Sequence, residues 1–273
     1  MQVNNFEPSC FNEIIDCFLA SFEGYFVTMP TDKNSYKERW KAAKLDYHLS
    51  YGMYDGELLV GFILHAVDTR NNEKIAYNTG TGVLPAYRGK RIVKDIYTVA
   101  LAELKRNGIT KSTLEVIKEN DKAIKSYESV GFTICKDYKC FSGKLPTHSN
   151  KGITTKEIPM HKVDWAQLPN QSFYSWDNQK ESILEGKYSF FQVEMNTTPL
   201  AYFIKHTSSN YIAQCDVLSP NVDWNLLFEG MQQVSETMRI NNVDERHSEK
   251  INAFNKIGLQ NSIDQFEMEL LLS

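Results

Sequence analysis

The spacing of apolar positions changes several times along the first half of the chain. Apolar residues recur at helical intervals over residues 11–26 and 36–45, which predicts two helices near the N-terminus. Residues 49–68 read instead as two strands on either side of Asp55-Gly56, a dipeptide typical of hairpin turns. Another strand is expected within residues 71–85, after an Asn-Asn turn.

Beyond this point helix and strand patterns alternate. The elements expected are a helix over 92–106 ended by Gly108, a strand over 112–118, a short helix between Asn120 and Gly131, and one or two strands over 132–143. Asn120 has the residue type of an N-cap, and both glycines suit helix ends. This order predicts an α+β (mixed α/β) fold with a β-α-β-α-β centre.

A shortened second copy of this pattern follows a polar stretch. Residues 248–259 align in sequence with residues 121–132 at an offset of 127, and residues 199–204 align with residues 59–64 at an offset of 140. Two matches in the same order favour duplication over chance similarity of amphipathic segments. We therefore expect a domain over residues 1–145, a linker over 146–157 and a degenerate copy over 158–273.

Composition narrows the class of protein. The chain has 273 residues, 42% of them hydrophobic, and a net charge of −4, which argues against a general binder of nucleic acid or anionic membranes. The N-terminus lacks the pattern of a signal peptide, and the apolar run 58–67 is too short to span a bilayer, so a cytoplasmic location is expected. Five cysteines without C-x-x-C and six histidines without ligand spacing predict reduced thiols and no metal site.

One turn is strongly basic although the chain as a whole is acidic. Arg88, Lys90, Arg91 and Lys94 lie at the start of the helix expected over 92–106, and Gly89 allows close backbone approach. A helix N-terminus offers unpaired amides and a positive dipole end, so a phosphate or diphosphate is the natural ligand. The alternative is a solvated basic turn that only starts a helix.

Two motifs give this region a family resemblance. Val83-Leu84-Pro85-Ala86-Tyr87-Arg88-Gly89 is followed by an L-x-V-x-x-x-N-x-x-A-x-x-x-Y-x-x-x-G-F pattern that begins at Leu114 and ends at Phe132. Together they resemble the GNAT (Gcn5-related) N-acetyltransferase family, whose coenzyme loop reads Q/R-x-x-G-x-G/A. Arg91 and Val93 stand where that loop has small residues, so side-chain bulk replaces free backbone there.

The resemblance implies a central mixed sheet flanked by helices, duplicated here, and acetyl-CoA as co-substrate. The residues that it implies for coenzyme binding are Thr81, Gly82, Val83, Leu84, Arg88, Gly89, Lys90, Arg91, Ile92, Val93 and Asn120. Tyr127 is implied as the general acid that protonates the leaving thiolate, and Glu115 is the candidate base. Phe254 stands at the position of Tyr127 in the second copy, which predicts a half that packs without catalysing.

Both catalytic assignments have structural alternatives. Tyr127 lies on an apolar helix face and suits core packing, while Glu115 suits a half-exposed ion pair with Lys111. The predicted function is N-acetyl transfer to a primary amine, in a small molecule or at a peptide N-terminus, by direct attack. The alternative is an inactive acyl-CoA-binding or interaction protein. We expect neither nucleic acid nor membrane as a partner, and a homodimer is compatible with the sequence.

Overall fold

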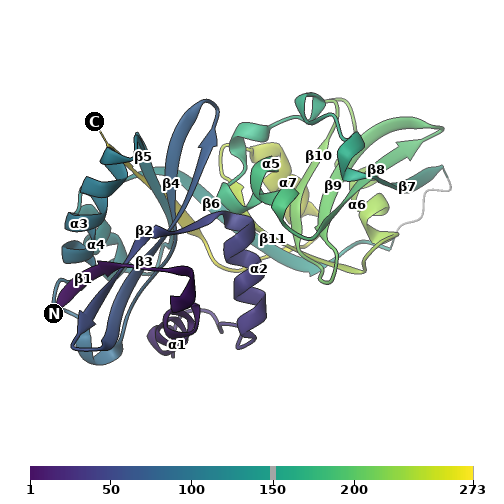
Figure 1. Cartoon of the computed structure of the whole chain (residues 1–273). Coiled ribbons are helices and arrows are strands. Elements are labelled where there is room, and N and C mark those ends of the chain that lie inside the picture. The colour runs from purple at the N-terminus through teal and green to yellow at the C-terminus, as the bar shows by residue number, and fades with distance from the viewer. Residues whose placement is uncertain (148–151, 273) are drawn as a thin grey trace. The chain divides into compact units, whose positions relative to one another are not determined.

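The computed structural model describes residues 1–147 and 152–272, which fall into two compact units (Figure 1). The first unit comprises Met1–Cys135 with Glu267–Ser273, and the second comprises Lys136–Phe266. In the part of the chain that the structure describes, no helix is long and apolar enough to cross a membrane.

The first unit is built on a sheet with the strand order β1-β2-β3-β4-β5-β13. Its elements are β1 (Gln2–Asn5), α1 (Phe11–Ser21), α2 (Lys33–Ala43), β2 (Leu45–Asp55), β3 (Leu58–Arg70), β4 (Glu73–Val83), α3 (Ile92–Arg106), β5 (Lys111–Ile117), α4 (Asp121–Glu128) and β13 (Gln265–Leu271). The strands β1 to β4 pair antiparallel with their neighbours, whereas β4 and β5 pair in parallel. The sheet is therefore mixed, as predicted.

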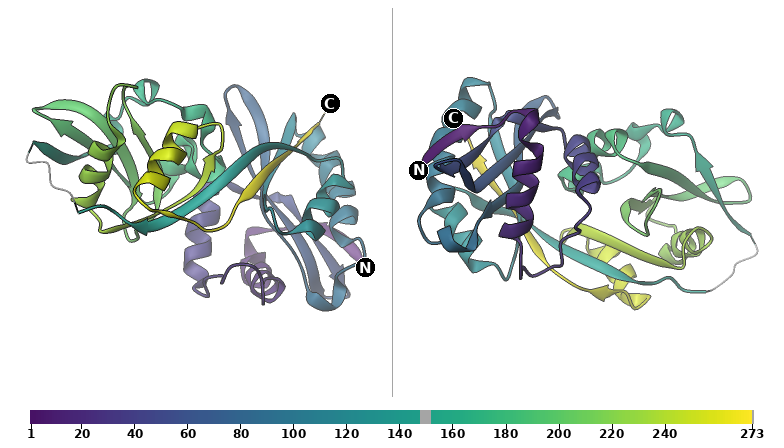
Figure 2. Two further views of the ribbon diagram at one scale, coloured as in Figure 1. Left: turned by 180° about the vertical axis from the view of Figure 1, so that it is seen from behind. Right: turned by 60° about the horizontal axis from the view of Figure 1, so that its bottom comes forward.

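Helices α1 and α3 cover opposite faces of this sheet (Figure 2). A Cβ atom on Gly82 would lie 2.8 Å from the Ser21 Cβ atom of α1, and one on Gly61 would lie 2.8 Å from a methyl group of Ile92 in α3. Because real Cβ atoms do not approach so closely, these two glycines are what allows both helices to lie against the strands.

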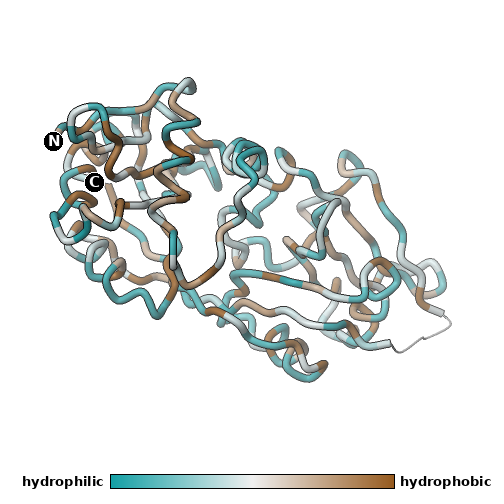
Figure 3. The backbone as a smooth tube through the Cα atoms, turned by 90° about the horizontal axis from the view of Figure 1, so that it is seen from below, coloured by the Kyte–Doolittle hydropathy of each residue, from teal (hydrophilic) through white to brown (hydrophobic). Residues whose placement is uncertain are grey.

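Apolar side chains fill the layers on each face of the sheet. On the α1 face the buried cluster includes Phe11, Phe18 and Trp40 beside Phe62 of β3. A separate cluster joins Leu104 of α3 to strand residues and to residues near the C-terminus. Figure 3 shows apolar and polar segments alternating along the chain, in keeping with these buried layers.

The second unit contains a four-stranded antiparallel sheet with the order β10-β9-β8-β7. Its elements include β6 (Thr133–Lys144), β7 (Ile153–Ile158), α5 (Lys180–Glu185), β8 (Tyr188–Met195), β9 (Thr198–His206), β10 (Ile212–Val217), α6 (Trp224–Gln232), β11 (Thr237–Asp244), α7 (Ser248–Lys256) and β12 (Gln260–Asn261). Strands β11 and β12 both pair with β6. Phe228 of α6 and Phe254 of α7 are fully buried in its core.

The strand registers show the duplication directly. In the first unit β4 pairs with β3 as Gly82↔Phe62 and Gly80↔Leu64, and then slips by one residue. In the second unit β10 pairs with β9 as Asp216↔Tyr202 and Gln214↔Ile204, and the register then shifts by one residue at the equivalent position. The two halves therefore share one fold, including the position of a β-bulge.

Several boundaries differ from the sequence expectations. Helix α1 ends at Ser21 rather than continuing to Phe26, since Gly24 adopts a φ of 69° and turns the chain. Strand β1 was not expected, and residues 153–157 of the expected linker belong to β7. Residues 148–151 of that linker lie outside the described part of the chain.

Candidate functional site

The candidate site begins where β4 and β5 stop pairing. Their parallel ladder runs from Ile75↔Lys111 to Asn78↔Leu114, although β4 continues to Val83 and β5 to Ile117. The bulge in β4 lies at the same point. The ends of two neighbouring strands therefore leave backbone groups that do not bond to each other.

At the end of β4, alternate residues turn their backbone groups away from β3. The Leu84 amide donates to the Val60 carbonyl of β3 at 2.9 Å, so Leu84 and Gly82 form the hydrogen-bonded pairs with that strand. The N–H and C=O groups of Thr81 and Val83 consequently point away from β3, toward the side on which β5 lies. Gly82 is needed for the close packing of α1.

The basic turn forms a concave row of amides ahead of α3. Gly89 has a φ of 78° and Arg91 a φ of 62°, and this return to positive φ at alternate residues turns successive N–H groups to one side. Among the described residues no side chain caps the amides of the first turn, which starts at Ile92 and Val93. The turn therefore has the geometry of an anion-binding site.

Arg91 departs from the family motif in residue type but has a left-handed backbone conformation. Its left-handed conformation is one that glycine adopts freely and that costs other residues about 1 kcal/mol. Arg91 adopts this conformation at a position where the resembling motif has a small residue, and its side chain is exposed. Val93, at the other such position, is partly buried in the first turn of α3.

The cations of the turn differ in their contacts. Arg88 donates from Nη2 to the Ser21 carbonyl at 2.9 Å and from Nε to the Val83 carbonyl at 3.3 Å, so it ties the end of α1 to the end of β4. Lys90 lies over the Tyr87 ring at 4.5 Å and is exposed. The Arg88 side chain therefore shapes the turn, whereas Lys90 and Arg91 face solvent.

Asn120 caps α4 and reaches a second group. Its Oδ1 accepts from the Ala123 amide at 3.2 Å, which confirms the predicted N-cap, and its Nδ2 donates to the Tyr25 hydroxyl at 3.2 Å. Tyr25 lies in the segment after α1, and burial raises the pKa of its phenol. Tyr25 thereby connects this segment to the start of α4.

The ring of Tyr127 in α4 lies 6.5 Å from the ring of Tyr97 in α3, centroid to centroid. The Tyr97 hydroxyl accepts from Asn78, the last residue of β4 that pairs with β5. The Tyr127 ring is buried. Burial raises the pKa of Tyr127 to about 12. The phenol is therefore protonated at neutral pH and able to donate a proton.

Glu115 follows Leu114, the last paired residue of β5. Strand alternation places it on the sheet face opposite Leu114, the face that α1 covers, whereas Asn78 lies on the face of α3. Lys111, its alternative partner, has its ammonium 3.1 Å from a carboxylate oxygen of Glu73. Glu115 thus lies at the strand opening, on the side facing away from α3.

An open hollow of about 450 Å³ borders the site. It is lined by Leu19, Ala20, Phe22, Glu23, Gly24, Tyr25, Val27, Thr28, Met29 and Thr31. Glu23 contributes the one carboxylate among these residues, and the remaining lining is apolar or neutral. Trp40 and Tyr51 are buried in the core.

The second unit lacks the features of this site. Helix α6 is capped by Asp223, whose carboxylate accepts from the Asn225 amide at 3.0 Å, so negative charge occupies the position of the basic turn. Asp216 and Lys250 stand where the first unit has Gly82 and Ala123.

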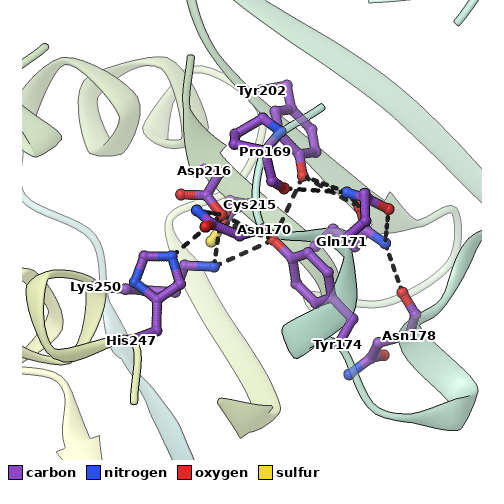
Figure 4. A network of polar contacts seen from close by, with 11 residues as sticks. Pro169, Asn170, Gln171, Tyr174, Asn178, Tyr202, Cys215, Asp216, His247 and Lys250 are labelled. Atoms are coloured by element: carbon purple, nitrogen blue, oxygen red, sulfur yellow. Dashed lines mark hydrogen bonds and ion pairs between the residues drawn. The ribbon is translucent and has the colours of Figure 1, made fainter. Parts of the chain in front are cut away.

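Asp216 and Lys250 form a buried ion pair at 3.0 Å (Figure 4). Tyr174 donates to the Asp216 carboxylate at 3.3 Å and His247 lies 3.5 Å from it. Although burial alone would raise it, the pKa of Asp216 is lowered, chiefly by the Lys250 ammonium. Buried polar side chains thus fill the part of the second unit that is equivalent to the candidate site.

Sequence comparison identifies similar proteins. Residues 9–132 match the model of the acetyltransferase (GNAT) family. A mycothiol acetyltransferase of Corynebacterium efficiens is 32% identical over 82 residues, which is 30% of this chain and 27% of that protein's length.

Solved structures share the fold of the whole chain. A tandem GNAT protein from the clavulanic acid biosynthesis pathway has a TM-score of 0.74 at 11% identity, with 100% of this chain and 99% of that chain covered. A GCN5-related N-acetyltransferase from Sphaerobacter thermophilus has a TM-score of 0.69 at 11% identity, covering 99% and 95%. The whole chain therefore shares its fold with these two proteins.

Proposed function

Because the chain belongs to the GNAT acetyltransferase family through residues 9–132, we propose that its first unit transfers an acetyl group from acetyl-CoA to a primary amine. The observation that supports the proposal is the buried Tyr127 ring, which lies 6.5 Å from the ring of Tyr97. The Tyr97 hydroxyl accepts from Asn78, the last residue of β4 that pairs with β5. The name of the curated relative supports acetyl transfer as the class of reaction.

The coenzyme binds along β4 and the basic turn. The amides from Gly89 to Val93 hold its diphosphate, with Lys90 and Arg91 adding positive charge. The backbone groups of Thr81 and the amide of Val83, which face away from β3, bond the pantetheine amides, which fill the gap in the sheet. The Val83 carbonyl already accepts from Arg88. The thioester then lies near the Tyr127 phenol.

The reaction needs two proton transfers, one to the departing sulfur and one from the attacking amine. The neutral amine attacks the thioester carbonyl, the C–N bond forms and the C–S bond breaks. Tyr127 gives its proton to the departing sulfur, and Glu115, directly or through water, takes the proton released by the amine. The acid and the base lie on opposite sheet faces, so the two transfers do not compete for one position.

The acceptor enters through the hollow beside Tyr25. Its apolar lining suits the body of an organic molecule, and the Glu23 carboxylate suits a cationic ammonium group before deprotonation. Small amines and peptide N-termini both meet this description.

We propose that the second unit serves a structural role. Its helix start carries Asp223 in place of cations, and the Asp216–Lys250 pair occupies the equivalent of the coenzyme path. Phe254 replaces the phenol. One coenzyme per chain is therefore expected, measured as the molar ratio in calorimetric titration with CoA.

Thiol release from acetyl-CoA with a panel of amines tests the activity. Tyr127→Phe is expected to lower the rate about 100-fold, the usual effect of losing a general acid. Tyr51→Phe is the matched control, since it removes a hydroxyl from another buried tyrosine of the same unit whose charged neighbours lie near the end of α3. CoA binding without turnover on any amine would favour an acyl-CoA-binding protein instead.

A further inference from the structure

Residues 22–31, which lie between α1 and α2, supply most of the lining of the hollow, and we call them the acceptor segment. Within the described chain, the only amides of this segment that donate to backbone carbonyls are those of Phe22 and Tyr25. Phe26 and Val27, in its middle, are 51% and 39% exposed. A segment with so few backbone bonds opens easily, so its shape depends on side-chain contacts from its neighbours.

One such contact comes from the basic turn. Ser21 is the last residue of α1, so its carbonyl has no partner within that helix, and α1 itself contains no Lys or Arg. Arg88 supplies the cation from outside, because its Nη2 donates to the Ser21 carbonyl at 2.9 Å while its Nε donates to the Val83 carbonyl at 3.3 Å. A guanidinium presents these two donors in a fixed fork, which a lysine ammonium does not. The start of the acceptor segment is therefore held by the turn.

A second contact comes from the start of α4. The Asn120 side chain accepts from the Ala123 amide through Oδ1 and donates from Nδ2 to the Tyr25 hydroxyl at 3.2 Å. Because the cap needs the oxygen, the nitrogen of this side chain is the atom that faces Tyr25. The Tyr25 ring also packs edge-on against Phe22 and Phe26, with centroids 4.8 and 5.1 Å apart. The middle of the acceptor segment is therefore held by α4.

We propose that Arg88 and Tyr25 are positioning residues for the acceptor, which transmit binding of the coenzyme to the acceptor segment. This inference rests on the proposed function, in which the amides next to Arg88 hold the diphosphate and α4 carries the general acid. A coenzyme that fixes the turn and the start of α4 also fixes both contacts, so the acceptor meets a segment that is already ordered. The Arg88 side chain thus serves the acceptor, although its place in the motif implies a coenzyme contact.

Hydrogen exchange of the whole protein saturated with CoA, measured by mass spectrometry on peptides of the acceptor segment, tests this without an acceptor. Arg88→Lys keeps the charge but loses the fork. Tyr25→Phe keeps the ring and loses the oxygen that accepts from Asn120. Each variant is expected to exchange about fivefold faster in this segment than the wild type, the effect of one lost hydrogen bond on the opening equilibrium. CoA is expected to slow exchange there about threefold in the wild type and hardly at all in the two variants.

Two matched controls come from the same turn. Arg91→Lys makes the same replacement at a side chain that faces solvent, and Tyr87→Phe removes a hydroxyl that donates to Asp55 at 2.9 Å. Neither is expected to change exchange of the acceptor segment. Peptides of β5, inside the sheet, report whether each variant is folded, and their exchange is expected to stay as in the wild type.

Steady-state kinetics provide a second readout, with the amine of the activity panel that is turned over fastest. In Arg88→Lys and Tyr25→Phe the acceptor itself must order the segment, so its KM is expected to rise about fivefold. The value of kcat is expected to change less than about twofold, because the ordered complex is the same once it has formed. A loss confined to kcat would contradict a role in positioning the acceptor.

The outcomes distinguish this inference from the proposed function. CoA that binds the wild type without slowing exchange of the acceptor segment would overturn the coupling and leave the proposed function standing. Equally fast exchange in Arg91→Lys and Arg88→Lys would also overturn it, because a general disturbance of the turn would then explain both. A wild type that binds no CoA in calorimetric titration would overturn the proposed function, and this inference with it.

Discussion

The ion pair between Asp216 and Lys250 predicts a large effect of one substitution on the stability of the second unit. The side chains are 1% and 3% exposed and lie 3.0 Å apart. At an effective dielectric constant of about 20 their attraction is about 5 kcal/mol. Lys250→Met removes it and leaves a buried carboxylate.

The expected loss is smaller than this attraction. Lys250 no longer has to be desolvated, and Asn170 and Tyr174 still donate to Asp216. Removal of one partner from a buried pair costs about 3–5 kcal/mol, and we expect the lower figure, about 3 kcal/mol. For a unit of this size that corresponds to a fall in melting temperature of roughly 10 °C.

Urea and thermal unfolding measure the effect, with Lys256→Met as the matched control. Lys256 is exposed on the same helix, so its replacement is expected to cost under about 0.5 kcal/mol. The double variant Asp216→Asn/Lys250→Met is expected to recover most of the loss, because no charge remains buried.

The pH dependence has a defined sign. In the wild type the lowered pKa of Asp216 stabilises the fold above about pH 4, and this contribution is lost as pH falls through the folded pKa. Without Lys250 the carboxyl protonates more readily, so the deficit of the variant narrows as pH falls from 7 toward 5. A deficit below 1 kcal/mol at pH 7, or a double variant no better than Lys250→Met, would refute the reasoning.

Three further predictions concern the first unit. Arg91→Gly is expected to be about 1 kcal/mol more stable to urea than Arg91→Ala, because only glycine adopts a φ of 62° freely. Both variants remove the charge and are expected to weaken CoA binding about threefold. Equal stability of the two variants would argue against backbone strain. Leu272→Ala is expected to cost about 2–3 kcal/mol because Leu272 is buried, while Leu271→Ala, at a 66% exposed site, costs under about 0.5 kcal/mol in the same denaturant titration. Burial lowers the pKa of His65 to about 4, so the unfolding free energy should fall by about 3 kcal/mol from pH 6.5 to 4, and His65→Gln should remove that slope.

Local patterns in the sequence predicted the elements that position the site. The period of apolar residues and the glycine at 108 gave helix α3 with its observed ends, and Asn120 gave the cap of α4. Helix α1 was predicted too long, because Phe22, Tyr25 and Phe26 continue its apolar spacing although the chain has turned; Phe22 and Tyr25 line the hollow. Apolar residues that line a hollow carry the same local signal as those that fill a core.

Contacts between distant residues were not predictable in this way. No motif marks Asn78 or Tyr25, and their contacts with Thr81 and Asn120 depend on the fold. The loss of cations in the second copy was visible in the sequence. The buried pair that replaces the open path was not, since Asp216 and Lys250 are 34 residues apart.

The assignment of residues 267–272 to the first unit affects how the protein folds during synthesis. Leu272 donates its amide to the Thr110 carbonyl at 2.7 Å and packs beside Leu104 of α3. The ribosome must make all of Lys136–Phe266 before these residues emerge, which takes on the order of ten seconds at usual rates of translation. The first unit, although most of it is made first, therefore cannot complete its sheet until the second unit has been made, and until then β5 lacks β13 as its neighbour.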